Sequence, residues 1–124
     1  MRAVVCVVVV VMPGVKNSWY VDSAAVGGPG DYETALTGDL RHQMEKTLPV
    51  RKDREGRAIA GLSMGGFGAL HLAYGHEDLY GAVASLSGAI WQNVPASDLD
   101  KTPAELKLIQ DSAFFHRIDR TTVT

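Results

Sequence analysis

Short apolar runs and longer amphipathic stretches alternate along most of the chain. Three short runs predict strands, at residues 4–12, 57–62 and 82–86. Apolar residues recur at helical spacing in longer stretches, which predict helices at residues 31–48, 63–74 and 103–115. Strands that alternate with helices in this order indicate a parallel sheet with crossover helices on both faces, an α/β fold.

The chain starts with an apolar, valine-rich run, MRAVVCVVVVVMPG. A basic start before an apolar run is also typical of secretory signal peptides. Valine is a strand former, however, and no small-x-small cleavage site follows directly. We therefore expect residues 4–12 to form a central strand buried on both faces, with Cys6 as a buried thiol. The run is too short to cross a bilayer as a helix.

Composition and charge exclude several function classes. The 124 residues fit one domain, and the net charge is −2 with scattered Lys and Arg residues. Partners such as nucleic acid or an anionic membrane surface need clustered basic residues, so neither is expected. A single cysteine cannot form an internal disulfide, and no Cys/His grouping has zinc spacing. We expect no metal or organic cofactor, and the sequence leaves the compartment open.

The segment from Gly61 to Gly65 reads G-x-S-x-G and lies between a predicted strand and a predicted helix. That context is typical of a nucleophile elbow, where small residues let strand and helix cross closely. Such a turn would raise the hydroxyl of Ser63 above the carboxyl edge of the sheet. The backbone N–H of Met64 would then be one donor of an oxyanion hole. Ser85 and Ser87 lie at the end of the strand predicted at 82–86, and neither is expected to be a nucleophile, because neither has an elbow.

The segment GLSMGGFGALHLAYGHEDLYGAVASLSGAIW, with VVVMPG, NSWYVDS and DYETALTGDL before it, resembles a known esterase family. That family includes esterase D (S-formylglutathione hydrolases), feruloyl esterases and mycolyltransferases. The resemblance runs from about residue 7 to 91 and implies an α/β-hydrolase fold that cleaves carboxylic esters with a Ser–His–Asp triad. It makes Ser63 the nucleophile and Met64 an oxyanion donor.

In that family the acid and the histidine follow the nucleophile on later strands, beyond the end of this sequence. Residues 1–124 are therefore predicted to be a single, partial α/β-hydrolase domain, with a truncated parallel sheet and flanking helices.

The general base has to be sought among four histidines or outside this chain. Along the helix that follows Ser63, His71 lies about 12 Å away and His76 about 19 Å, too far for a hydrogen bond. His42 is expected on the surface of the preceding helix. His116 lies in a segment that could fold back over the sheet edge, so it is the candidate base. A histidine from a partner chain, or from sequence absent here, is the alternative.

Two aromatic residues, Trp19 and Tyr20, lie in the long loop after the first predicted strand. Open α/β sheets bind ligands at the carboxyl ends of their strands, so both residues are expected to line an acyl or aryl pocket. Packing of the loop against the sheet rim is the alternative. Asp31, Glu33 and Thr34 are expected to cap and charge the start of the helix at 31–48.

The resulting hypothesis is a serine carboxylic-ester hydrolase that acts on small acyl or aryl esters. The alternative is a truncated, catalytically weak or inactive hydrolase fragment that acts as a binding or assembly module. Acyl transfer to a carbohydrate is a third option. The apolar edges of a small sheet also predict association into a homo-oligomer.

Overall fold

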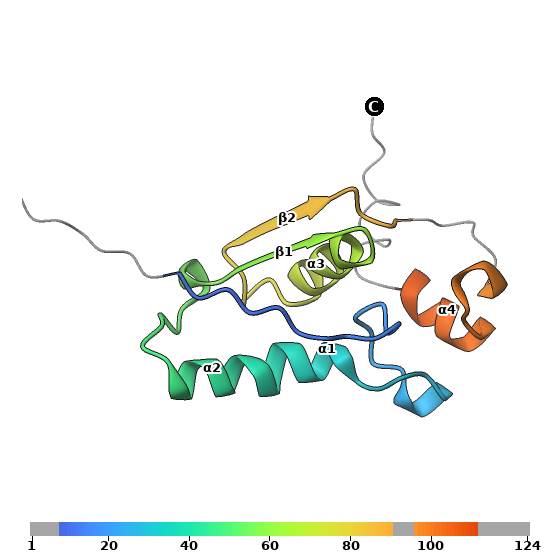
Figure 1. Cartoon of the computed structure of the whole chain (residues 1–124), viewed down its shortest axis with the longest axis horizontal. Helices are drawn as coiled ribbons and strands as arrows, with labels where there is room; N and C mark the ends of the chain where they lie inside the picture. The colour runs from blue at the N-terminus through green and yellow to red at the C-terminus, as the bar shows by residue number, and fades with distance from the viewer. Residues whose placement is uncertain (1–7, 91–95, 112–124) are drawn as a thin grey trace, which may run out of the picture.

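The computed structural model describes residues 8–90 and 96–111, and its centre is a two-stranded parallel sheet. Strand β1 (Ala58–Leu62) leads into helix α3 (Met64–Gly75), which returns the chain to strand β2 (Ala82–Leu86) (Figure 1). The strands pair in register from Ala58↔Ala82 to Leu62↔Leu86. Both lie where the apolar runs predict strands, and they form a β–α–β unit.

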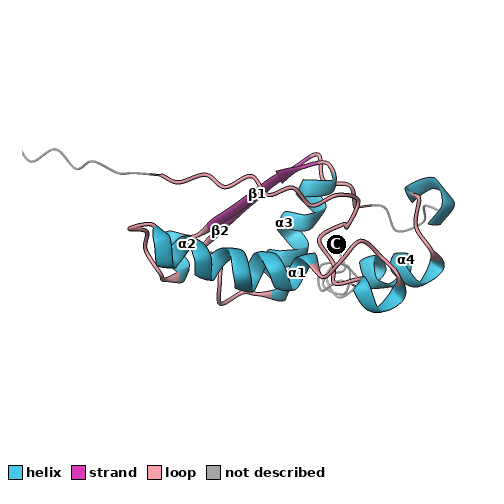
Figure 2. Cartoon of the chain, turned by 60° about the horizontal axis from the view of Figure 1, so that its bottom comes forward, coloured by secondary structure: helices cyan, strands magenta, loops and turns pink. Residues whose placement is uncertain are grey.

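The remaining helices lie before and after this unit. A continuous helical run consists of α1 (Tyr32–Thr34), a π-helical stretch (Ala35–Leu40) and α2 (Arg41–Thr47), inside the predicted 31–48. Helix α4 (Pro103–Gln110) begins with a capping box between Thr102 and Glu105. The last residues of the predicted helix 103–115 lie outside the described ranges. Figures 1 and 2 place α4 at the end of the molecule opposite to the C-terminal end of α2.

The predicted strand at 4–12 differs from the structure over its described part. Residues 8–12 run as extended chain, and Val8 and Met12 are 80% and 90% exposed. A strand needs a neighbouring backbone to pair with, and within the described ranges no ladder of hydrogen bonds joins this segment to β1. The sheet therefore has two strands here, not the predicted three.

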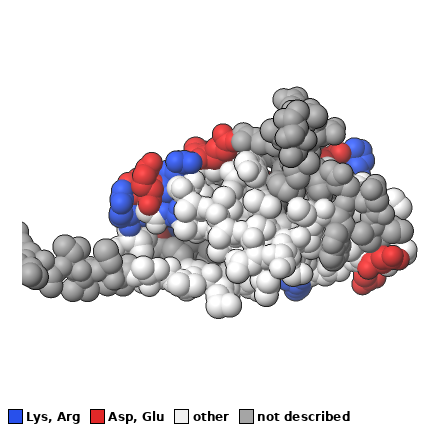
Figure 3. All heavy atoms as spheres, turned by 90° about the horizontal axis from the view of Figure 1, so that it is seen from above, with Lys and Arg blue, Asp and Glu red and all other residues white. Residues whose placement is uncertain are grey.

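Helix α3 covers one face of the sheet in part, and the other face is bare. Burial alternates along β1, with Ile59 and Gly61 on the side of α3. The opposite face carries Leu62 and Leu86, which are 68% and 55% exposed. Figure 3, which views the molecule from above, shows uncharged atoms over the middle of this view and charged side chains at its margins. The prediction of helices on both faces is therefore not met by the described residues.

The core lies beside the sheet, between the loop at residues 15–23, α3 and α4. Phe67 of α3 is fully buried, and its ring meets that of Trp19 edge to face with centroids 5.5 Å apart. Val21, Ala89 and Ile109 complete this cluster. Because Ile109 belongs to α4, the same contact also docks that helix on the loop.

Glycines bring α3 unusually close to the strands. A Cβ atom on Gly61 would lie 2.0 Å from the carbonyl oxygen of Gly65, and one on Gly66 would lie 2.7 Å from the Cα atom of Gly88. Real Cβ atoms do not approach other atoms so closely. The β1–α3 turn and the contact of α3 with the end of β2 both require glycine.

Glu33 ties α1 to α3. Its Oε2 lies 2.8 Å from Nε2 of His71, and its Oε1 lies 2.8 Å from Nε2 of His76. Glu33 lies in the first turn of its helix and so places a negative charge there, as the sequence predicts, but its carboxylate bonds to the two histidines instead of capping the helix. The other predicted capping residues also bond elsewhere: Asp31 accepts from the backbone N–H of Ala24, and the hydroxyl of Thr34 donates to Asp22.

The charged residue Arg57 fixes the start of β1. Its guanidinium donates two hydrogen bonds to Oε1 of Glu45 on α2, at 2.6 and 2.9 Å. It also donates to the carbonyl oxygens of Lys52 at 2.6 Å and Leu79 at 3.0 Å. One side chain thus joins α2, β1 and the segment before β2.

Gly61→Ala tests the close crossing of β1 and α3. The added methyl group would collide with the backbone of Gly65, so the free energy of unfolding is expected to fall by about 3 kcal/mol. Gly38→Ala is the matched control, because a Cβ there meets no atom within 4 Å. In a helix interior that change should raise stability by about 0.5–1 kcal/mol. Urea denaturation measures both, and equal stabilities would contradict the predicted close contact.

Glu33→Gln tests the tie between α1 and α3. Burial alone would raise the pKa of Glu33, but the hydrogen bonds and charges of His71 and His76 together outweigh it and hold that pKa below its ordinary value of 4.5. A carboxyl group whose pKa is lower in the folded than in the unfolded state stabilises the fold at pH values above its unfolded pKa. This stability is lost as the pH falls through the folded pKa. Glu33 is partly exposed, so we expect a loss of about 1 kcal/mol at pH 7 that diminishes as the pH falls below 4.5 and through the lowered pKa of the folded state. Denaturation across pH measures it; a pH-independent difference would contradict the charge-based origin.

Candidate active site

Ser63 occupies a strained turn between β1 and α3. Its backbone angles are φ 56° and ψ −117°, a conformation that residues other than glycine rarely adopt. Its N–H donates to the carbonyl oxygen of Leu86 at 3.0 Å, and its carbonyl oxygen accepts from Phe67 and Ala89 at 3.1 and 2.9 Å. These hydrogen bonds stabilise a backbone conformation whose strain costs about 1–3 kcal/mol relative to a common one. The side chain is exposed at the carboxyl edge of the sheet.

The N-terminus of α3 begins directly after this serine. The first N–H groups of a helix have no partner inside the helix, and here they belong to Met64, Gly65 and Gly66. The helix dipole adds positive potential at the same end. Met64 itself packs its side chain against the core. The edge beside Ser63 can therefore stabilise a negatively charged oxygen.

Trp19 and Tyr20 both have left-handed backbone conformations, with φ 54° and 61°, but their surroundings differ. Trp19 is 6% exposed, and its indole N–H donates to Oδ1 of Asn17 at 3.2 Å. Tyr20 is half-buried, and its ring lies where a Cβ atom on Gly68 would stand. Its hydroxyl would be 3.3 Å from a Cβ atom on Gly65, in the first turn of α3.

These contacts separate the two aromatic residues by role. The buried indole supports a packing role for Trp19, which was the alternative left open by the sequence. Tyr20 keeps its hydroxyl near the turn that carries Ser63. Burial raises the pKa of Tyr20 above its ordinary value. The hydroxyl therefore stays protonated at neutral pH and can donate a hydrogen bond.

The described histidines do not reach Ser63. His71 and His76 are both bound to Glu33, as expected from their distance along α3. His42 is exposed on α2, 3.2 Å from a guanidinium nitrogen of Arg41. His116, the candidate base, lies outside the described residues. Within residues 8–90 and 96–111, the site consists of a strained serine, helix N–H groups and a nearby tyrosine hydroxyl.

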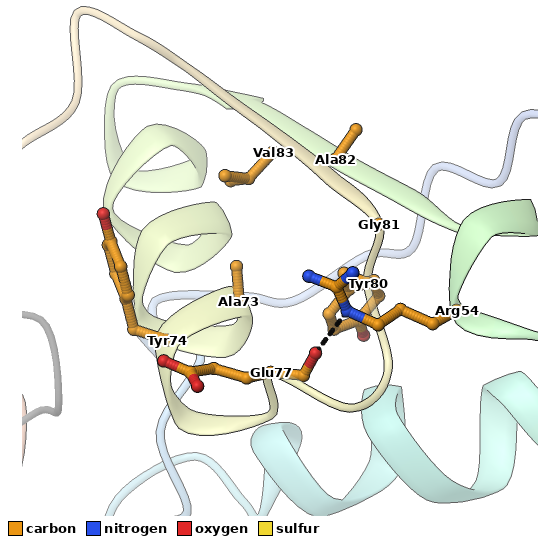
Figure 4. A pocket seen from close by; sticks show the side chains of 8 residues that line it. All are labelled: Arg54, Ala73, Tyr74, Glu77, Tyr80, Gly81, Ala82 and Val83. Atoms are coloured by element: carbon orange, nitrogen blue, oxygen red, sulfur yellow. Dashed lines mark hydrogen bonds between the residues drawn. The ribbon is translucent and has the colours of Figure 1, made fainter.

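A cavity of about 280 Å³ opens at the amino ends of the strands, away from Ser63. Figure 4 shows Arg54 reaching from the turn before β1 towards the end of α3, where it donates to the carbonyl oxygen of Glu77 at 2.6 Å. Ala73, Tyr80 and Val83 also line this cavity. Catalytic groups of parallel sheets gather at the carboxyl ends, so this cavity is not the candidate site.

A second cavity, of about 320 Å³, lies between α1, α3 and α4. It is lined by Asp22, Glu33, His71 and Asp111, with apolar Val21 and Leu108. In the described part of the chain, no three His, Cys, Asp or Glu side chains are placed to hold a metal ion. No helix described here is long and apolar enough to cross a membrane.

Ser87 is a feature that the sequence analysis set aside. It directly follows β2, its φ is 47°, and its side chain is exposed at the same edge as Ser63. Its neighbour in the strand, Ser85, instead donates its hydroxyl to the carbonyl oxygen of Gly66 at 3.0 Å. Nothing in the local sequence signals the left-handed conformation of Ser87, because that conformation depends on how β2 and α3 meet.

Known proteins share both sequence and fold with this chain. Esterase Rv1288 of Mycobacterium tuberculosis (strain ATCC 25618 / H37Rv) is 33% identical over 109 residues, which cover 75% of this chain and 23% of that protein. A solved ferulic acid esterase is 37% identical with a TM-score of 0.54, over 68% of this chain and 34% of that one.

A second solved structure extends the similarity over more of the chain. FphF, a fluorophosphonate-binding serine hydrolase of Staphylococcus aureus, has a TM-score of 0.65 at 21% identity, over 88% of this chain and 44% of that one. These similarities show the α/β-hydrolase fold that the sequence predicts. The chain spans about a quarter of the length of the curated relative, whose 23% coverage is given above.

The family model named Esterase, described as "Putative esterase", matches residues 2–117, nearly the whole chain. This match confirms the family resemblance that the segments around Ser63 indicate. The chain belongs to the esterase family of α/β-hydrolases.

Proposed function

We propose that the chain is the nucleophile-bearing part of a serine carboxylic-ester hydrolase. The observation that supports it most directly is the backbone of Ser63, with φ 56° and ψ −117° between a parallel strand and a helix. Strained residues of this kind cluster at active sites. Together with the G-x-S-x-G pattern, this backbone supports a nucleophile elbow.

The proposed reaction starts with attack of the Ser63 hydroxyl oxygen on the ester carbonyl carbon. A general base takes the hydroxyl proton as the new C–O bond forms. The N–H of Met64 donates to the oxyanion of the tetrahedral intermediate. When that intermediate collapses, the bond to the alcohol breaks and the alcohol takes the proton. Water then hydrolyses the acyl-enzyme in the same way and releases the carboxylic acid.

His116 is the proposed base within this chain. The described histidines are excluded from this role by their position, because His71 and His76 are bound to Glu33 and His42 is exposed on α2. A histidine from another copy, or from residues outside this sequence, is the alternative source. Either base would have to approach the exposed side of Ser63.

Small acyl or aryl esters are the proposed substrates. The solved relative named ferulic acid esterase supports an ester whose acyl part is aromatic. Tyr20 is the proposed lining residue, since its half-buried ring lies against the first turns of α3 and leaves a protonated hydroxyl near Ser63. Trp19 would support the position of Tyr20, because its ring packs against Phe67 of α3.

A second candidate function is that of a catalytically weak binding or assembly module. The bare sheet face, with exposed Leu62 and Leu86, favours association of this chain. Both candidates predict that the chain forms a homo-oligomer, because burial of such side chains is favourable. They differ in whether Ser63 turns over substrate.

Ser63→Ala separates the two candidates. Loss of the nucleophile should lower kcat for p-nitrophenyl acetate and butyrate by about 10⁴- to 10⁶-fold. Release of p-nitrophenol at pH 7.5 measures it, with Ser97→Ala as a surface serine control. Equal rates for the wild type and Ser63→Ala would favour the binding module.

His116→Ala tests the source of the base. If the base lies in this chain, the variant should lose activity about as fully as Ser63→Ala, because the members of a triad act as a unit. His42→Ala is the matched control, since that histidine is exposed on α2. Retained activity in His116→Ala would exclude His116 as the base.

Association should be visible by light scattering coupled to size-exclusion chromatography. At micromolar concentration we expect a mass above the 13.3 kDa of one chain. Leu62→Glu together with Leu86→Glu should shift the mass towards the monomer, since two charges would be buried at the contact. A monomeric wild type would contradict association through this face.

A further inference from the structure

A buried lysine binds the loop at residues 15–23. The side chain of Lys101 is only 3% exposed, and the residue directly precedes Thr102, the N-cap of α4. Its Nζ donates to the backbone carbonyl oxygen of Asn17 and lies 3.4 Å from Oε1 of Glu105. Burial of an ammonium group is costly unless the group is paired and hydrogen-bonded. Lys101 therefore depends on these two oxygens.

The helix itself does not favour a lysine at this position. The N-terminus of a helix is the positive end of its dipole, so a cation beside it is unfavourable. Lys107 shows the ordinary arrangement, because its side chain is 73% exposed and pairs with Asp111 at the other end of α4. The contact that distinguishes Lys101 is its bond to the carbonyl oxygen of Asn17, 84 positions away in sequence.

Asn17 connects α4 to the loop. Its side-chain amide donates to the carbonyl oxygen of Leu99 at 3.4 Å, and its Oδ1 accepts from the indole N–H of Trp19 at 3.2 Å. Together with the bond from Lys101, these contacts hold both the backbone and the side chain of Asn17. The residue lies three positions before Tyr20, so its position limits where that tyrosine can lie.

The loop needs such support because its backbone is strained. Lys16, Trp19 and Tyr20 all have left-handed conformations, with φ of 49°, 54° and 61°. Residues other than glycine rarely adopt these conformations, which persist only where surrounding contacts hold them. Tyr20 has its hydroxyl near the first turn of α3, which directly follows Ser63. Release of the loop would therefore let Tyr20 move away from the proposed nucleophile.

We propose that Lys101 is a positioning residue of the active site, which holds Tyr20 beside the Ser63 turn through its bond to Asn17. This inference rests on the proposed ester hydrolysis, in which Tyr20 lines the substrate pocket. Without the bond, the loop would occupy its binding-competent conformation for only a fraction of the time. The apparent affinity for substrate falls by that fraction. Loss of Lys101 should therefore raise KM and leave kcat, which reports on the bound state, almost unchanged.

Lys101→Met tests this role, with Lys107→Met as the matched control on α4. We expect KM for p-nitrophenyl butyrate to rise about 10-fold in Lys101→Met, with kcat per reactive site within about twofold of the wild type. An organophosphate ester counted by intact mass gives the fraction of chains with reactive Ser63. Lys107→Met should keep the wild-type KM, because its side chain does not contact the loop.

A second variant separates positioning from a folding defect. Lys101→Met alone would leave Glu105, which is 7% exposed, without its cationic partner. Lys101→Met combined with Glu105→Gln removes both charges. Glutamine serves a capping box as well as glutamate does, so α4 keeps its N-terminal cap. The double variant should show the same rise in KM as Lys101→Met.

A cycle with Tyr20 identifies the route of the effect. In a Tyr20→Ala background, Lys101→Met should cause no further rise in KM, because its effect passes through the tyrosine. Effects of the two substitutions that multiply would overturn the proposal. A wild-type KM in the double variant, or a loss confined to kcat, would also overturn it and leave Lys101 a structural residue.

The failure of this inference can be told from the failure of the proposed hydrolysis. If the wild type is no faster than Ser63→Ala, the hydrolysis itself fails and this inference fails with it. If the wild type shows Ser63-dependent turnover, the KM values of the Lys101 variants decide the positioning role alone.

Discussion

The close crossing of β1 and α3 is the constraint on which the rest of the structure depends. A Cβ atom on Gly61 would stand 2.0 Å from the carbonyl oxygen of Gly65, so strand and helix touch backbone to backbone. A chain that leaves a strand and enters a helix at this distance has to turn within one residue. That residue is Ser63, and its positive φ is the conformational consequence. The N-terminus of α3 is thereby directed to the carboxyl edge of the sheet.

Packing on the far side of α3 holds this turn in place. Phe67 is fully buried against Trp19, which brings the loop at 15–23 onto the helix, and Ile109 brings α4 onto the loop. Glu33 binds His71 of α3 and His76, the residue after α3, and so fixes the start of the preceding helix. The loop is thus held on α3 by apolar packing, and α1, which follows the loop, is held on α3 by Glu33. Tyr20 takes its place beside Gly65 and Gly68 because of both.

The same arrangement leaves the sheet half covered. α3 protects one face, while Leu62 and Leu86 remain exposed on the other. The chain spans about a quarter of its curated relative (23%) and about a third of a solved ferulic acid esterase (34%). Exposed apolar side chains of this size favour burial against another surface. Association and ester hydrolysis are linked proposals, since the exposed Leu62 directly precedes Ser63 in the chain.

Local patterns in the sequence determined the β–α–β unit, the family and the position of Ser63. Apolar runs of strand length, glycines around a serine and helical spacing are short-range signals, and each acts over a few residues. The sequence placed Glu33 in the first turn of its helix but could not show its bonds to His71 and His76, because those partners are remote in sequence. Among the residues that the structure describes, the run at 8–12 pairs with no strand, because pairing requires a neighbouring backbone, which propensity cannot supply.

Only the tertiary structure decided how the edge beside Ser63 is built. It buried Trp19 and left Tyr20 at the first turn of α3, although the two residues are adjacent in sequence and equally aromatic. It also placed Ser87 next to Ser63 and gave it a positive φ. The register between β1 and β2 and the close approach of α3 to the strands set these positions. Both arise from contacts between residues about 20 or more positions apart, which no local pattern encodes.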